Sequence, residues 1–171
     1  MEPPPQIKSA RVLDLFSYWD RIRSGRLAPR WSDMQPSAIK RLLPYVIMAD
    51  VLSDPFDVRY RIVGTAVTEA FGYDFTGETL REPERSTDTS SWVAFYREFV
   101  DRRGPCFAQY RVTLGLADAR VVDVGVFPIS DDGLSINRLV ELEDWDAEQG
   151  FRPGVINPTA DDLTILAPTL G

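Results

Sequence analysis

The side chains that could perform acid–base or nucleophilic chemistry in this chain are carboxylates and one thiol, because its 171 residues include no histidine. Ser-His-Asp and Cys-His nucleophile systems therefore cannot form within the chain. Histidine-ligated haem is excluded for the same reason. A zinc site would lack almost all of its usual nitrogen and sulfur ligands. The remaining candidates are Cys106 and the acidic side chains.

A run of five acidic residues lies near the end of the chain: Glu141, Glu143, Asp144, Asp146 and Glu148. The run lacks the spaced Asp or Asn ligands and the glycine of a calcium loop. We therefore interpret it as a solvated surface run. Asp123 alternates with the valines of a predicted strand, so we expect it to face water as well.

Catalysis by a carboxylate would require an acid inside an apolar pocket, where burial raises its pKa. The strand patterns place no carboxylate clearly on an inward face. The sequence therefore predicts no catalytic residue and no metal ligand.

Cys106 begins a predicted strand in the stretch GPCFAQ. A single cysteine cannot form an internal disulfide, which fits a reducing compartment. We expect a buried, inert thiol, because a redox sensor needs an exposed thiolate of low pKa. Asp74, in the stretch FGYDFTG, is predicted to hold a turn by binding backbone amides. Contact with a ligand is the alternative role for Asp74.

The composition predicts a protein with a well-filled core and an acidic surface. Hydrophobic residues make up 44% of the chain and aromatic residues 11%, and the net charge is −7. Such a charge disfavours nucleic acid and anionic membranes as partners, unless a local basic patch is present. No apolar run approaches the roughly 20 residues that span a bilayer, and the N-terminus does not resemble a signal peptide. We therefore expect a soluble cytoplasmic protein.

The first predicted helix starts at Ala10 and ends near Ser24-Gly25, a common C-terminal stop. Apolar residues recur along it at three- and four-residue spacing: Val12, Leu15, Phe16, Trp19 and Ile22. One interpretation is a helix that covers its own core. The other is a homodimer interface, because the spacing resembles a short heptad stripe.

The rest of the chain alternates between short helices and strands. Pro36 and Pro44 bound a second predicted helix, over Pro36–Leu43. A short helix is expected at residues 66–71 and a longer one from Thr89 or Ser90 to Arg103. Alternation predicts strands at residues 45–52, 58–63, 106–114, 121–126 and 136–142, with a hairpin loop at 53–57 and antiparallel neighbours.

Three stretches in this order resemble the PAS_5-like bacterial family of small single-domain PAS proteins with a leading helical pair. They are LFSYWDRIRSGRLAPRWSDMQPSAIKRLLPYVIMADV, RYRIVGTAVTEAFGYDFTG and VGVFPISDDG, and the resemblance covers roughly residues 12–142. It implies an α+β fold with a five-stranded antiparallel sheet and helices on one face. We expect an N-terminal helical extension at 1–44, a PAS-like domain at 45–143 and an acidic and apolar tail at 144–171.

The resemblance also implies a site between the sheet and its helices. Its expected ligand-binding residues have apolar faces, several with one hydrogen-bonding atom: Tyr60, Ile62, Phe71, Trp92, Tyr96, Tyr110 and Val124. The alternative is a packed core without a ligand. A flavin photoadduct is not expected, because Cys106 lies on a strand and the reactive cysteine of light-sensing relatives lies in a helix motif. The cofactor remains unassigned.

The leading hypothesis is a non-enzymatic sensory or protein-interaction module. It would bind a small apolar ligand, form a homodimer and signal through a separate protein partner. One alternative is a small cavity enzyme, an isomerase or hydrolase, that uses a buried carboxylate. Another is a structural adaptor with a filled core.

Overall fold

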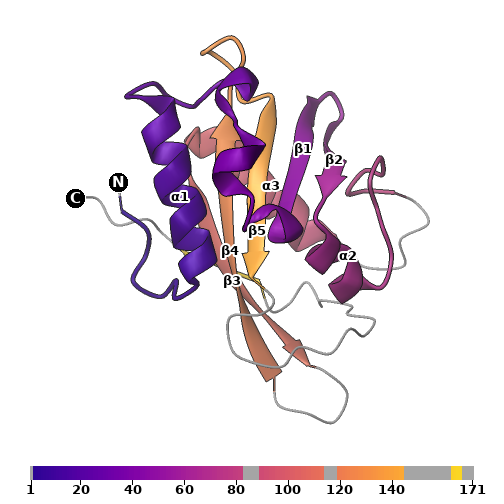
Figure 1. Cartoon of the computed structure of the whole chain (residues 1–171). Helices are drawn as coiled ribbons and strands as arrows, with labels where there is room; N and C mark the ends of the chain where they lie inside the picture. Colours follow the sequence, from indigo (N-terminus) through magenta and orange to yellow (C-terminus); the bar gives the residue numbers. More distant parts are fainter. Residues whose placement is uncertain (1, 83–88, 114–118, 145–162, 167–171) are drawn as a thin grey trace.

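The computed structural model describes residues 2–82, 89–113, 119–144 and 163–166, and within them six strands form one sheet (Figure 1). The strand order is β2-β1-β5-β4-β3-β6, and every neighbouring pair is antiparallel. The strands are β1 (Val46–Ser53), β2 (Phe56–Val63), β3 (Cys106–Thr113), β4 (Ala119–Ile129), β5 (Arg138–Asp144) and β6 (Thr164–Leu166). The predicted α+β fold with five antiparallel strands is confirmed, and β6 adds a sixth.

Three α-helices accompany the sheet: α1 (Ala10–Arg23), α2 (Thr65–Phe71) and α3 (Ser90–Arg102). The prediction of a second helix at Pro36–Leu43 is wrong. Three short 3₁₀ turns stand in this region instead: η1 (Trp31–Asp33), η2 (Pro36–Ile39) and η3 (Leu43–Tyr45). Pro36 and Pro44 each lie at the start of a turn, and Pro44 lacks the amide hydrogen that a continuing helix needs.

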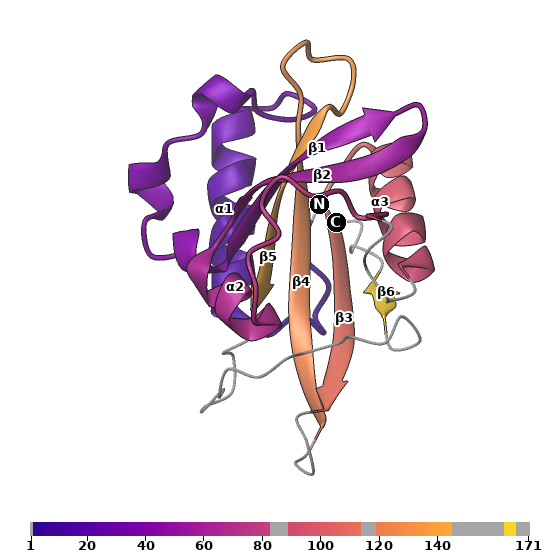
Figure 2. The ribbon, with the colours of Figure 1, turned by 90° about the vertical axis from the view of Figure 1, so that its right-hand side faces the viewer.

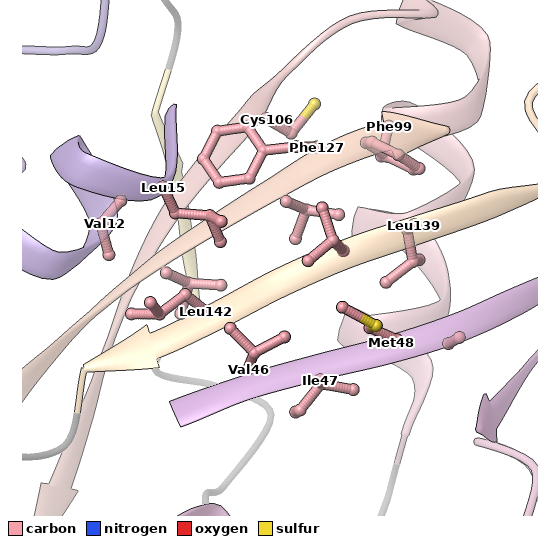
Figure 3. Packing of buried hydrophobic residues seen from close by; sticks show 14 of the residues in the cluster. Val12, Leu15, Val46, Ile47, Met48, Phe99, Cys106, Phe127, Leu139 and Leu142 are labelled. Atoms are coloured by element: carbon pink, nitrogen blue, oxygen red, sulfur yellow. The ribbon is translucent and has the colours of Figure 1, made fainter. Parts of the chain in front are cut away.

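The sheet is covered on both faces (Figure 2). The N-terminal extension supplies α1 to one face, and α3 packs on the other. On the α1 side, the Phe16 ring lies 6.0 Å from that of Phe107 and 6.1 Å from that of Phe127. Figure 3 shows Val12 and Leu15 of α1 beside the buried side chains of the central strands.

The apolar stripe of α1 packs on the sheet of its own chain. Val12 and Leu15 are fully buried and Trp19 is 2% exposed. The Trp19 indole N–H donates to the carbonyl of Pro128 at 2.7 Å. Phe16 and Ile22 are half-buried against the same core. A homodimer interface through this stripe stays a prediction, and the burial of its central side chains does not support it.

Two buried aspartates hold the start of α1 to the sheet. The backbone amides of Lys8 and Ser9 donate to Asp123 Oδ2 at 2.6 and 2.7 Å. Ser9, which caps α1, donates its hydroxyl to Asp144, and Arg11 pairs with Asp144 at 2.7 Å. Asp123 is only 5% exposed and Asp144 2%. The prediction that Asp123 faces water is wrong, because the segment before α1 covers it with backbone donors.

Replacing Asp123 by asparagine is expected to lower the free energy of unfolding by about 2 kcal/mol. The asparagine side chain lacks the negative charge of the aspartate, to which two backbone N–H groups and the Gln109 side chain donate hydrogen bonds. Urea denaturation measures the change. Asp14→Asn, at an exposed position of α1, is the matched control. Equal unfolding midpoints for Asp123→Asn and wild type would contradict this role.

A bulge in the β1–β2 pair reverses the alternation of β2. Met48 pairs with Ile62, but the next residue, Ala49, pairs with Tyr60, so Arg61 is an extra residue in the ladder. An inserted residue moves the side chains beyond it to the opposite face. Tyr60 is therefore buried, whereas Ile62 is 48% exposed. The expectation that Ile62 faces inward is wrong for this reason.

The described part of the tail lies along the edge of β3. Residues Phe107, Ala108 and Gln109 pair with β6. Leu163 and Ile165 pack against the core. Asp146 and Glu148 of the acidic run lie outside the described residues. The division into three segments stays a prediction.

Candidate functional site

Two pairs of buried tyrosine and glutamate side chains lie between the sheet and α3. The Tyr96 hydroxyl donates to Glu141 Oε2 at 2.6 Å, and the Tyr110 hydroxyl donates to Glu143 Oε2 at 2.7 Å. None of the four side chains is more than 4% exposed. The prediction that Glu141 and Glu143 belong to a solvated run is therefore wrong. The expectation that no strand carries an inward carboxylate is wrong as well.

The alternation of β5 explains this placement. Glu141 and Glu143 are two residues apart, so they share one face, while Leu142 and Asp144 face α1. Across the sheet, Glu141 is paired with Ile47 on one neighbouring strand and with Val126 on the other. The carboxylates are therefore set among apolar side chains rather than in water.

Glu141 has an unusual electrostatic environment. Its Oε1 is buried without a hydrogen-bond partner among the described residues. Burial raises the pKa of the Glu141 carboxyl well above its ordinary value, and the neighbouring Glu143 carboxyl raises it further. The hydroxyl of Tyr96 acts in the opposite direction. The folded protein therefore favours a protonated Glu141.

Both tyrosines are held as neutral hydrogen-bond donors. Burial raises the pKa of Tyr96 and of Tyr110 well above the ordinary value, and the nearby glutamates add to the shift. The cluster can therefore hold a proton on the Glu141 carboxyl, and because Tyr96 donates to Oε2, that proton lies on Oε1. This chemistry suits the recognition of a hydrogen-bonding group or a response to protonation.

An aromatic cluster adjoins these pairs. The Trp92 ring lies 5.5 Å from that of Tyr110 and 6.1 Å from that of Tyr96, measured between centroids. Trp92 itself is half-buried at the start of α3. The cluster therefore combines flat apolar faces with the hydroxyl and carboxyl groups behind them.

The predicted ligand-binding residues fall into two groups and one outlier. The Trp92 ring contacts the rings of Tyr96 and Tyr110, and Val124 is fully buried opposite Glu143 on the same sheet face.

Tyr60 and the half-buried Phe71 meet instead through Phe75, whose ring lies 4.8 Å and 5.3 Å from theirs. Ile62 points away from both groups.

Sequence reasoning missed Glu141, Glu143 and Phe75. The pattern of residues 140–144, Val-Glu-Leu-Glu-Asp, is typical of a strand with one solvent-exposed face. The signal that identifies its acids as buried is the apolar character of Ile47, Val124 and Val126, which follows only from the strand register.

The stretch from Gly64 to Gly77 builds one end of this interior. Gly72 ends α2 at φ 79°, and Gly77 lies at φ 94°, both in the left-handed region that favours glycine. Asp74 accepts a hydrogen bond from the amide of Thr76 at 2.9 Å, so it holds the turn as predicted. These turns place the Phe75 ring against the Tyr60 ring.

Cys106 lies on β3 and is fully buried. Burial raises the pKa of its thiol to about 12. This environment fits the inert thiol that was expected, because a thiolate is the reactive form.

Two other kinds of site are absent from the described residues. No group of three or more Cys, Asp or Glu side chains in these ranges could hold a metal ion. The described helices include none long and apolar enough to cross a bilayer.

Comparison with known proteins agrees with the fold. No curated protein matches the chain. A family model described as PAS domain matches residues 7–130, which is more than half of the chain and includes α1 and strands β1 to β4. The chain belongs to the PAS_5 family of PAS domains.

Proposed function

We propose that this protein is a non-enzymatic sensory or protein-interaction module that binds a small ligand in its interior and acts through a separate protein partner. Membership of the PAS family supports the general class. The observation that carries the ligand proposal is Glu141, whose Oε1 is a buried polar atom without a hydrogen-bond partner among the described residues. Buried polar groups are normally hydrogen-bonded, so the unpaired Oε1 marks a place where a hydrogen-bonding ligand group is favoured.

The ligand that fits is small and largely apolar, with one hydrogen-bonding group. This group would accept from Glu141 Oε1 when the carboxyl is protonated and would donate to it when the carboxyl is ionised. Its apolar body would contact the rings of Trp92, Tyr96 and Tyr110. Trp92 is the half-buried member of this set, so it lies nearest to the surface. A ligand bound there would stabilise one packing of α3 on the sheet, and a change in that packing would reach a partner protein.

Native mass spectrometry of freshly purified protein tests the proposal. We expect a mass above that of the bare chain, and a dimer peak at tens of micromolar. Trp92→Ala should reduce the ligand-bound fraction, because it removes one wall of the aromatic cluster. Trp31→Ala, which truncates an exposed ring, is the matched control and should leave the fraction unchanged.

The opposite results separate the alternatives. A bare-chain mass would contradict the ligand and favour a structural adaptor with a filled core. A monomer at tens of micromolar would contradict the homodimer. Equal ligand-bound fractions in Trp92→Ala and wild type would place the ligand elsewhere.

A small cavity enzyme, an isomerase or hydrolase, is the second candidate function. The buried carboxyl of Glu141, with its raised pKa, is the kind of group that acts as a general acid or base. However, Glu141 is fully buried and its Oε2 already accepts from Tyr96. A substrate would have to reach Oε1 from inside the fold. Membership of the PAS family instead supports a sensory or interaction role.

A further inference from the structure

A groove on the outer side of α1 lies apart from the buried interior. It has a volume of about 460 Å³ and lies between α1 and the segment that contains η2. Figure 1 shows this segment beside α1. Its lining residues are Asp14, Ser17, Tyr18, Arg21, Ser37, Ala38, Ile39, Lys40, Arg41 and Leu42. The volume is in the range of sites that bind small molecules.

The groove has an apolar floor that the fold holds in place. Tyr18, Ile39 and Leu42 are all buried, with exposures of 6%, 3% and 8%. The Tyr18 hydroxyl accepts a hydrogen bond from the amide of Gln35 at 2.7 Å. This bond ties α1 to the start of η2 and fixes the orientation of the ring. A flat ligand would therefore meet a preformed surface.

The rim of the groove is cationic although the chain carries a net charge of −7. Arg21, Lys40 and Arg41 are exposed, and Asp14 is the single acid in the lining. Within the described ranges, none of the three cations forms an ion pair. The Arg21 guanidinium lies over the Tyr18 ring, 5.5 Å from its centroid.

We infer that this groove binds a small organic anion with an apolar body. The apolar part would lie on Tyr18, Ile39 and Leu42. The anionic group would bind Arg21, Lys40 and Arg41, whose positive charges attract it from solution. It would not have to displace an acidic side chain, because these cations form no ion pair within the described ranges. This inference does not depend on the interior site, because the groove shares no residue with it.

A matched pair of fluorescent probes tests the inference. The anion 8-anilinonaphthalene-1-sulfonate and the neutral N-phenyl-1-naphthylamine carry the same rings and differ in the sulfonate. We expect the full chain to bind the anion saturably, at one site. Lys40→Gln/Arg41→Gln should bind it about tenfold more weakly. Binding of the neutral probe should not change between wild type and this variant.

The control variant is Arg81→Gln/Arg111→Gln, which removes two exposed cations that do not line the groove. It should bind the anion like wild type. Anion binding of unchanged affinity in Lys40→Gln/Arg41→Gln, equal weakening in both variants, or no saturable binding by wild type would each overturn the inference. An unchanged thermal midpoint of each variant shows that it is folded.

Discussion

Replacing Glu141 by glutamine is expected to remove a fall in stability that wild type shows as pH rises. Folding raises the pKa of this carboxyl above the ordinary value of 4.5. Between 4.5 and the folded pKa, the native protein holds a proton that the unfolded chain releases. Stability therefore falls with rising pH across this window, by up to about 1.4 kcal/mol per pH unit. Glutamine does not titrate, so its variant lacks this contribution.

Urea denaturation of wild type and Glu141→Gln, repeated at half-unit steps from pH 5 to pH 8, measures the effect. The difference in unfolding free energy between variant and wild type should increase with pH in favour of the variant. Glu69→Gln, at an exposed position of α2, is the control and should follow wild type at every pH. Parallel curves for Glu141→Gln and wild type would contradict the raised pKa.

Replacing Gly64 by alanine is expected to destabilise the fold by about 3 kcal/mol or more. A Cβ at this position would lie 2.2 Å from the carbonyl oxygen of Pro44 and 2.6 Å from that of Leu43. Both atoms belong to the backbone, so no side-chain rotation relieves the overlap. The Gly64 amide also donates to the carbonyl of Val46 at 2.9 Å, which holds the two segments together.

Thermal or urea unfolding of Gly64→Ala measures the loss. The neighbouring substitution Thr65→Ala, at an exposed position, is the control and should change the midpoint little. Gly64 has φ −64°, so its backbone conformation is open to any residue. A small effect of Gly64→Ala would show that η3 can move aside, and would contradict a rigid contact at this point.

Local signals in the sequence were sufficient for most of the elements. The apolar spacing from Val12 to Ile22 predicts α1, and Ser9 caps it. The alternation of residues 106–114 predicts β3, which the structure describes over Cys106–Thr113. These patterns depend on neighbours within a few residues, so the sequence alone carries them. The order of the elements then identified the family.

The errors about which side chains are buried depend on contacts between distant segments. Ile62 turns outward because β1 and β2 pair with an extra residue. Asp123 is buried because residues 8 and 9, far away in the chain, cover it. Glu141 is buried because its two neighbouring strands, β1 and β4, place apolar residues beside it. The periodicity of a single segment does not reveal such contacts with distant segments.

The alternation of β5 also constrains how the strand can pair. Its odd-numbered acids, Glu141 and Glu143, meet tyrosine hydroxyls on one face, while Asp144 meets Ser9 and Arg11 on the other. If β5 paired with its neighbours one position out of register, Leu142 would face the two tyrosine hydroxyls. The carboxylates of Glu141 and Glu143 would then face the apolar stripe of α1. Every misaligned pairing therefore loses hydrogen bonds on both sides at once. Polar residues in the interior thus select a single alignment of the central strand.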